Sequence, residues 1–179
     1  MPAIAFPLQW TIAPESRGKA ARTFAFEASA SELDALRRYV DVEDLCTFKA
    51  LVQTVPLIDG KVRVSGTFEA SLVQASVINL ESVSTAISDS FSVEYWPAQL
   101  IRDETSEIVD LDSDPPEALD ASGALPIGAL LSELLALSVD PYPRNEDDTL
   151  EWDRAAGEDQ GGPFAALASL KTSDSSAGE

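Results

Sequence analysis

The middle of the chain, from residue 45 to residue 96, alternates apolar and polar side chains with a period of two. Such a period places neighbouring side chains on opposite faces of an extended strand, whereas an amphipathic helix repeats about every 3.6 residues. We therefore expect three strands with one buried face, at about residues 45–56, 61–75 and 83–96. The inward side chains of the third strand are expected to be Val83, Ile87, Phe91, Val93 and Tyr95.

Turn signals between these strands favour an antiparallel meander. Asp59 and Gly60 separate the first two strands, and both residue types favour the positive φ angles of a tight hairpin turn. Pro56 cannot donate to a sheet ladder, so this stretch is expected at an edge or a bulge. Gly66 interrupts the apolar face and predicts a bend. The parity of the apolar positions slips near Val73, which predicts a bulge.

One helix is expected before the meander in the sequence and another after it. Residues 23–28 alternate as a short strand, and Ser29 with Glu32 then fits a capping box that opens a helix near residues 30–40. A second helix, near residues 128–138, is apolar nearly all round and is expected to be buried on more than one side. The predicted fold class is α+β, a curved antiparallel β meander with these two helices.

A single α+β domain is expected to span residues 1–171. An acidic loop interrupts it at about residues 103–120, and one brief apolar run within residues 107–111 favours a short strand there. Residues 145–162 are expected to form an acidic flexible segment, and residues 172–179 a disordered tail.

Two absences limit the chemistry that the chain can perform. It contains no histidine and one cysteine, Cys46, which excludes Ser-His-Asp and Cys-His triads, histidine metal sites and thiolate clusters. No catalytic residue, cofactor or metal site is therefore predicted. Cys46 lies on the apolar parity of its strand and is expected to be a small buried side chain. Carboxylates of residues 103–120 with magnesium remain formally possible, although a loop offers them no rigid scaffold.

The charge balance is strongly acidic. The chain has 12 Lys and Arg against 31 Asp and Glu, a formal net charge of -19. Proteins that grip nucleic-acid phosphates usually carry a basic patch, so this acidity suits a basic partner or simply solubility. No apolar run is long enough to span a membrane, and the first residues lack the pattern of a signal peptide. We expect a cytoplasmic protein with no membrane partner.

Three segments share their order and spacing with one known family. They are residues 73–83 (VQASVINLESV), 133–144 (ELLALSVDPYPR) and 162–171 (GPFAALASLK). In this joint order the chain resembles the YceD family, bacterial proteins linked to the accumulation of large-subunit ribosomal RNA. The resemblance covers most of the chain, from about residue 23 to residue 171. It implies a part in accumulating or processing that RNA, and it transfers no catalytic residue.

One departure from the family pattern bears on metal binding. Many relatives carry a Cys-x-x-Cys pair in the central strand, consistent with a zinc knuckle. Ser76 and Asn79 occupy those positions in this chain, and neither offers a thiolate, so we predict no zinc. Together with Gln74 they are expected to form cross-strand hydrogen bonds at a bulge, and a binding edge is the alternative.

Residues 140–144, Asp-Pro-Tyr-Pro-Arg, are the candidate partner-binding segment. Two prolines favour an extended conformation that presents Tyr142 and Arg144, beside Asp140, with little entropy left to lose. Tyr and Arg are also common interface anchors. The competing interpretation is a helix terminator, in which Tyr142 packs and Arg144 pairs with an acid.

Lys49, Lys61 and Arg63 are the candidate RNA contacts. They form the only basic cluster on the predicted sheet, which Arg37 and Arg38 extend; the competing interpretation is a solvated strand face. The leading hypothesis is a non-enzymatic ribosome-assembly factor that binds a basic ribosomal protein or a ribosome-maturation factor. Direct binding of precursor ribosomal RNA is the first alternative, and a metal-dependent RNA-processing enzyme is the second.

Overall fold

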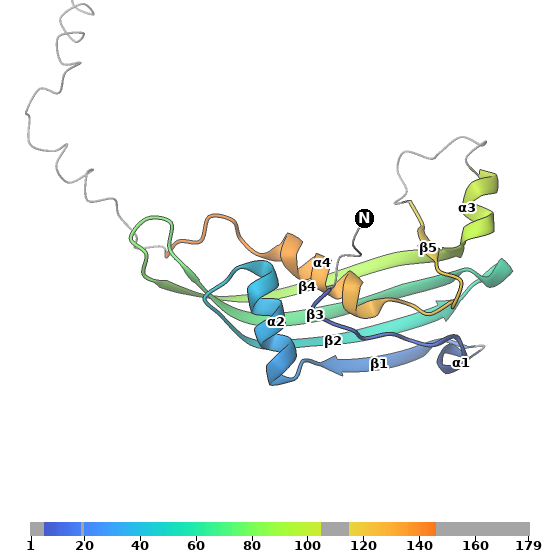
Figure 1. Cartoon of the computed structure of the whole chain (residues 1–179), viewed down its shortest axis with the longest axis horizontal. Helices are drawn as coiled ribbons and strands as arrows, with labels where there is room; N and C mark the ends of the chain where they lie inside the picture. Colours follow the sequence, from blue (N-terminus) through green and yellow to red (C-terminus); the bar gives the residue numbers. More distant parts are fainter. Residues whose placement is uncertain (1–5, 19, 105–114, 146–179) are drawn as a thin grey trace, which may run out of the picture.

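A computed structural model describes residues 6–18, 20–104 and 115–145 of the chain. Its centre is an open sheet of five strands in sequence order, antiparallel throughout except for the last, parallel pair (Figure 1). The strands are β1 (Arg22–Glu27), β2 (Asp44–Pro56), β3 (Val62–Ala75), β4 (Ser82–Pro97) and β5 (Glu117–Leu119). The predicted α+β class with a curved meander is confirmed.

Helices cover one face of this sheet. α2 (Ala30–Val40) and α4 (Ile127–Ser138) contact each other and lie on the same side of the strands (Figure 1). The shorter helices are α1 (Pro14–Arg17), η1 (Ile58–Gly60) and α3 (Ala98–Glu104). None of the helices in the described part of the chain has the length and apolarity needed to cross a bilayer.

The three predicted strands agree with β2, β3 and β4 to within one residue at each end. In the turn between β2 and β3, Asp59 has a φ of 61° and Gly60 a φ of 75°, and the Lys61 N–H donates to the Ile58 carbonyl at 3.2 Å. The Asp-Gly pair therefore forms the tight turn that its residue types predicted, and Pro56 is the last residue of β2.

Gly66, within β3, permits a close approach from both neighbouring strands. A Cβ atom at this position would clash with the Leu51 carbonyl oxygen of β2 and lie 3.1 Å from the Phe91 ring of β4. The apolar face is interrupted here because a backbone carbonyl and an aromatic ring occupy the space of a side chain.

The bulge predicted near Val73 lies on the neighbouring strand instead. β3 pairs with β4 in unbroken register, and the register shift occurs in β2 between Leu45 and Thr47. The extra residue is Cys46, which is exposed while Leu45 and Phe48 are both buried. The expectation of a buried cysteine is therefore wrong, because a bulge shifts the parity of its strand by one residue.

The N-terminal segment closes the helical layer. Ile12 pairs with Leu125 in an antiparallel bridge, and the Gly128 N–H donates to the Trp10 carbonyl at 2.8 Å. A Cβ atom on Gly128 would overlap the Leu8 carbonyl, so α4 can approach this segment only because residue 128 has no side chain.

Trp10 connects this segment to the sheet and to α2. Its ring centroid lies 5.1 Å from that of Phe26 and 6.2 Å from that of Phe48, and its indole N–H donates to Glu32 Oε1 at 2.7 Å. Glu32 Oε2 accepts the backbone N–H of Ser29 at 2.9 Å, as the capping box at the start of α2 predicted.

α4 is buried on one side only, contrary to the expectation of burial on more than one side. Ile127, Leu131 and Leu135 are fully buried, whereas Leu137 is 82% exposed. The apolar composition of the run did not distinguish the two sides. The sheet and the N-terminal segment cover one face, and Leu137 projects from the other.

Part of the predicted acidic loop belongs to regular structure. β5 pairs with the last three residues of β4, Tyr95–Pro97, and α3 ends at Glu104. A three-residue strand carries too little periodicity to be predicted. The short strand expected within residues 107–111 lies outside the described residues, as do residues 146–179 with the expected tail.

We call the sheet face away from α2 and α4 the open face. Its side chains alternate with the buried ones along each strand. They include Ala25, Glu27, Lys49, Leu51, Thr67, Glu69, Ser88, Ser90 and Ser92.

Candidate partner-binding surface

Two segments that are distant in sequence meet at one end of the sheet. Gln74 Nε2 donates to the Asp140 carbonyl at 2.9 Å, and the Val77 N–H donates to the Pro143 carbonyl at 2.9 Å. Figure 1 shows the green loop after β3 beside the orange segment after α4. They belong to residues 73–83 and 133–144, two of the three segments singled out in the sequence; the third, residues 162–171, lies outside the described residues.

The loop between β3 and β4 is fixed by its own hydrogen bonds. The Ser76 N–H donates to the Glu81 carbonyl at 2.8 Å, and the Leu80 N–H donates to the Ser76 carbonyl at 3.0 Å. Ser76 Oγ accepts the Ile78 N–H at 3.1 Å, and Asn79 Oδ1 accepts the Glu81 N–H at 3.0 Å. Side-chain oxygen acceptors at Ser76 and Asn79 thus hold the turn. The predicted cross-strand role differs in detail: the Ser76 and Asn79 side chains accept backbone N–H groups of the loop, and the Gln74 side chain bonds to the segment after α4.

Three apolar side chains project from this end of the molecule. Val77 is 54% exposed, Leu80 is 79% exposed and Tyr142 is 73% exposed. Leu80 has a φ of 62°, which is uncommon for a residue other than glycine, and the Tyr142 N–H donates to Asp140 Oδ1 at 2.8 Å. We define the tip surface as Val77, Leu80, Asp140, Tyr142 and Arg144.

The helix-terminator interpretation accounts for only part of this geometry. α4 does end at Ser138, and Pro143 is buried against the loop. Tyr142 is exposed, however, and Arg144 is exposed without an ion pair to any described residue. The segment is therefore anchored at Pro143 and presents the two predicted anchor side chains to solvent.

Carboxylates surround the apolar side chains of the tip surface. The Glu43 N–H donates to the Val73 carbonyl at 3.0 Å, and Ser82 Oγ donates to Glu43 Oε2 at 3.2 Å, so Glu43 lies beside the loop. Glu81 and Asp140 are exposed at the same end. A negative rim around apolar side chains attracts cationic groups of a partner and disfavours acidic ones.

The candidate RNA contacts do not form one cluster. Arg63 lies opposite Val55, six residues along β2 from Lys49, which at about 3.3 Å per residue separates them by about 20 Å. Arg37 and Arg38 are both engaged by Asp34 on α2. The sequence grouped these cations because it does not show where along the sheet each one falls.

Each of the three candidate RNA contacts also has a partner within the protein. Lys49 Nζ lies 3.0 Å from Glu27 Oε1, Arg63 Nη2 lies 2.7 Å from Glu94 Oε1, and Lys61 Nζ lies 3.3 Å from the centroid of the Trp96 ring. The hydrogen bonds from Arg63, followed by that from Trp96, hold the pKa of Glu94 below its ordinary value. A phosphate would have to compete with these contacts.

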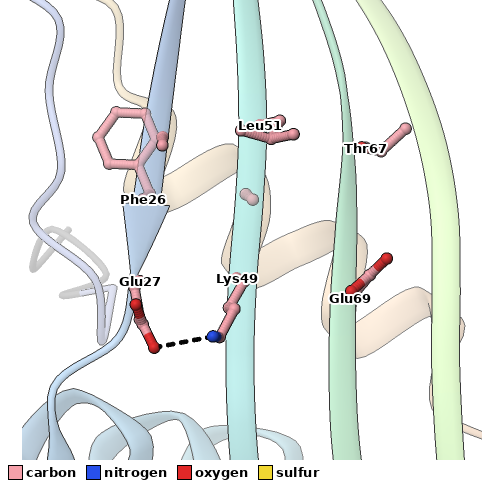
Figure 2. Close-up of a pocket in the computed structure, with 8 residues that line it drawn as sticks. Phe26, Glu27, Lys49, Leu51, Thr67 and Glu69 are labelled. Atoms are coloured by element: carbon pink, nitrogen blue, oxygen red, sulfur yellow. Dashed lines mark ion pairs between the residues drawn. The ribbon is translucent and has the colours of Figure 1, made fainter.

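A hollow of about 410 Å³ lies on the open face between β1, β2 and β3. Figure 2 shows Lys49 reaching toward Glu27, with Leu51 and Thr67 beyond them and Glu69 on the far side. Leu51 is 55% exposed, so the hollow has a partly apolar floor. It lies on the sheet itself and does not include any tip-surface residue.

In residues 6–18, 20–104 and 115–145, no three Cys, Asp or Glu side chains converge in a way that could hold a metal ion. No family model, curated protein or solved structure significantly matches the chain.

Sequence reasoning did not select Val77 and Leu80. Both occupy a loop between two strands, where an apolar side chain has no strand face on which to be buried. That mismatch between position and residue type is the signal that would have identified them, because exposed apolar groups gathered at one place mark interaction sites.

Proposed function

We propose that the protein is a non-enzymatic, cytoplasmic ribosome-assembly factor. It supports the accumulation or processing of large-subunit ribosomal RNA by binding a basic ribosomal protein or a maturation factor through the tip surface. The resemblance to the YceD family motivates the ribosomal part of this proposal, and the tip surface motivates binding as the mode of action.

One observation carries the proposal. The two described segments that bear the resemblance are hydrogen-bonded to each other at 2.9 Å in two places, and together they expose Val77, Leu80 and Tyr142. A single surface thus gathers an aromatic ring, an aliphatic side chain held at a positive φ, and the Arg144 guanidinium. Tyr and Arg are enriched among residues that dominate binding energy, each at roughly 2 kcal/mol or more.

Charge supports a basic partner in particular. The net charge of -19 gives the whole molecule a negative field, and Glu43, Glu81 and Asp140 place part of it around the apolar tip. Such a field speeds encounter with a basic protein and opposes contact with RNA phosphates.

The experiment compares two full-length variants. Leu80→Ala combined with Tyr142→Ala removes the two most exposed of the three apolar side chains of the tip surface. Ile58→Ala is the matched control, because Ile58 is also apolar, is 82% exposed and lies in η1, between β2 and β3. The measurements are the large-subunit proteins that co-purify with each variant, and the ratio of mature large- to small-subunit RNA in cells carrying only that variant.

The double variant is expected to lose co-purification and to lower the RNA ratio, while its melting temperature stays within a few degrees of the parent. Losing about 1–3 kcal/mol at each of the two positions weakens a micromolar complex by about thirtyfold or more. The Ile58→Ala control is expected to behave as the parent. An unchanged RNA ratio at normal protein abundance would remove the tip surface from the proposal.

A salt titration distinguishes direct RNA binding. If RNA is the partner, affinity for naked precursor RNA falls steeply with salt and is lost in a Lys49→Ala, Arg63→Ala variant. The proposal predicts almost no affinity for naked RNA at physiological salt.

A further inference from the structure

The outer edge of β4 is open along most of its length. β4 spans Ser82–Pro97, but β5 pairs only with Tyr95–Pro97. Within the described residues, the edge from residue 82 to residue 94 has β3 on one side and no strand on the other. Most natural proteins cover, bend or charge such an edge, because its unpaired backbone groups can accept another strand.

One hydrogen bond establishes which backbone groups face outward. The Ser76 N–H donates to the Glu81 carbonyl, so these residues form a hydrogen-bonded pair at the loop end of the β3–β4 ladder. The pairing of β3 with β4 continues from there without a break. Along an antiparallel ladder, hydrogen-bonded pairs alternate with non-hydrogen-bonded pairs, in which the backbone groups point away from the partner strand. The backbone groups of Val83, Ile87 and Phe91 therefore face β3. Those that face away from the sheet belong to Ser84, Ala86, Ser88, Ser90 and Ser92.

Asp89 confirms this assignment and marks the middle of the edge. Its Oδ1 accepts the Ser90 N–H at 2.7 Å, which is possible only because that N–H points away from β3. Its Oδ2 lies 3.5 Å from Ser138 Oγ, at the end of α4. The Asp89 carboxylate therefore lies beside the outward-facing backbone of β4, at the point where the end of α4 comes closest to this edge.

α4 supplies an apolar flank above the same edge. Leu130, Leu134, Leu137 and Ser138 follow i, i+4, i+7 and i+8 and so share one side of the helix. Ser138 places the end of that side beside Asp89. Leu130 and Leu134 are half-buried, and Leu137 is 82% exposed. A strand added to β4 would have this leucine stripe next to its helix-facing side chains.

We infer that the outer edge of β4 binds an extended segment of a partner protein, which carries an Arg or Lys opposite Asp89 and apolar side chains against the leucine stripe. This deepens the proposed function and rests on it for the basic character of the partner. The mode is strand addition, in which backbone hydrogen bonds supply affinity and alternate side chains supply specificity. A second copy of the chain is disfavoured, since each copy carries a net charge of -19 and would bring its own Asp89 to the shared edge.

Amide hydrogen exchange on the full-length protein tests the inference. The probe is the blocked peptide Thr-Val-Thr-Arg-Thr-Val-Thr, in which Val and Arg share one face, and the control peptide has Glu in place of Arg. In the free protein, the amides of Ser84, Ser88 and Ser92 should exchange rapidly, while those of Val83, Ile87 and Phe91 are already protected. The Arg peptide should slow the first set about tenfold when about nine tenths of the protein is bound, because exchange then proceeds from the free fraction. The second set should not change.

Three variants sharpen the result. Asp89→Asn should weaken the Arg peptide about two- to fivefold and abolish its advantage over the Glu peptide, whereas Asp59→Asn, which also removes one carboxylate, should change nothing. Ser88→Pro removes one outward N–H and leaves the β3 ladder intact, so it should abolish binding while the protein still melts cooperatively.

Two results would overturn the inference. One is no change in the outward amides with the Arg peptide at about 1 mM, a concentration that detects even weak association. The other is slow exchange of Ser84, Ser88 and Ser92 in the free protein, which would mean that the edge is already occupied. Neither result bears on the tip surface, whose test uses different residues and a ribosomal readout.

Discussion

Glu32 shows how much one side chain contributes to this fold. Its carboxylate accepts the Ser29 N–H at 2.9 Å, the Ser29 hydroxyl at 2.7 Å and the Trp10 indole at 2.7 Å. The bonds from Ser29, chiefly that from its side chain, hold the pKa of Glu32 below its ordinary value of 4.5. Glu32 therefore starts α2 and also ties the N-terminal segment to it.

The stabilising effect of Glu32 should depend on pH. Because its folded-state pKa is lowered, its contribution is complete above the ordinary carboxyl pKa and disappears as the pH falls through the folded value. Glu32→Gln should lower the melting temperature at neutral pH, and the difference from the parent should shrink as the pH falls below about 4. Thermal melts at a series of pH values measure this. A difference that stays constant down to low pH would show that the charge of Glu32 does not matter.

For single residues, the local hydrogen-bonding role of a side chain was easier to predict from the sequence than its exposure to solvent. The capping role of Glu32 followed from its spacing to Ser29, which is a local relation. Cys46 was placed on the wrong face because one bulge in β2 reverses the parity of everything before it. The exposure of Leu80 depends on a turn closed by Ser76 and Glu81, and the exposure of Tyr142 on how Pro143 docks onto that turn.

Among the elements, length determined what could be predicted. β2, β3 and β4 each repeat their pattern over many residues, so their boundaries were predictable to within one residue. β5 spans three residues and was missed, because it is a strand only by virtue of the β4 backbone beside it. The meeting of residues 74–77 with residues 140–143, which creates the candidate site, depends on how α4 packs. No local pattern encodes that placement.

The parity of β4 can be tested with two neighbouring substitutions. Ile87 packs against the core, whereas Ser88 is exposed on the open face. Ile87→Asp should lower the free energy of unfolding by about 2–4 kcal/mol, because a carboxylate loses hydration and apolar contacts are lost. Ser88→Asp adds the same charge and should change it by no more than about 0.5 kcal/mol. Chemical denaturation of both variants gives the comparison, and equal effects would mean that the faces of β4 are wrongly assigned.

For the molecule as a whole, charge opposes compactness. A net charge of -19 on 179 residues leaves many carboxylates without a cation, and such repulsion destabilises a compact state. The negative sign of the net charge was evident from composition alone. Its effect on binding depends on where the few cations lie, and the structure places Lys49, Lys61 and Arg63 in contact with partners of their own.

Added salt should therefore stabilise the protein. Raising sodium chloride from about 10 mM to about 300 mM shortens the screening length from about 30 Å to about 6 Å and weakens long-range repulsion more than the short ion pairs. The melting temperature should rise by a few degrees. A fall would indicate that pairs such as Lys49–Glu27 and Arg63–Glu94 outweigh the repulsion.

The close contact of Gly128 with Leu8 and Trp10 has a consequence for the order of folding. β2, β3 and β4 are joined by short loops, and β1 reaches β2 through α2, so a chain still being synthesised can form this part of the sheet as soon as β4 has emerged. The cover for their apolar face comes from both ends of that stretch, because Ile12 needs Leu125 and the Trp10 carbonyl needs the Gly128 N–H. A nascent chain therefore carries an assembled sheet with its Phe48 and Phe68 face incompletely covered until α4 has been made. During that interval the uncovered apolar face favours aggregation, and the mutual repulsion of the acidic side chains opposes it.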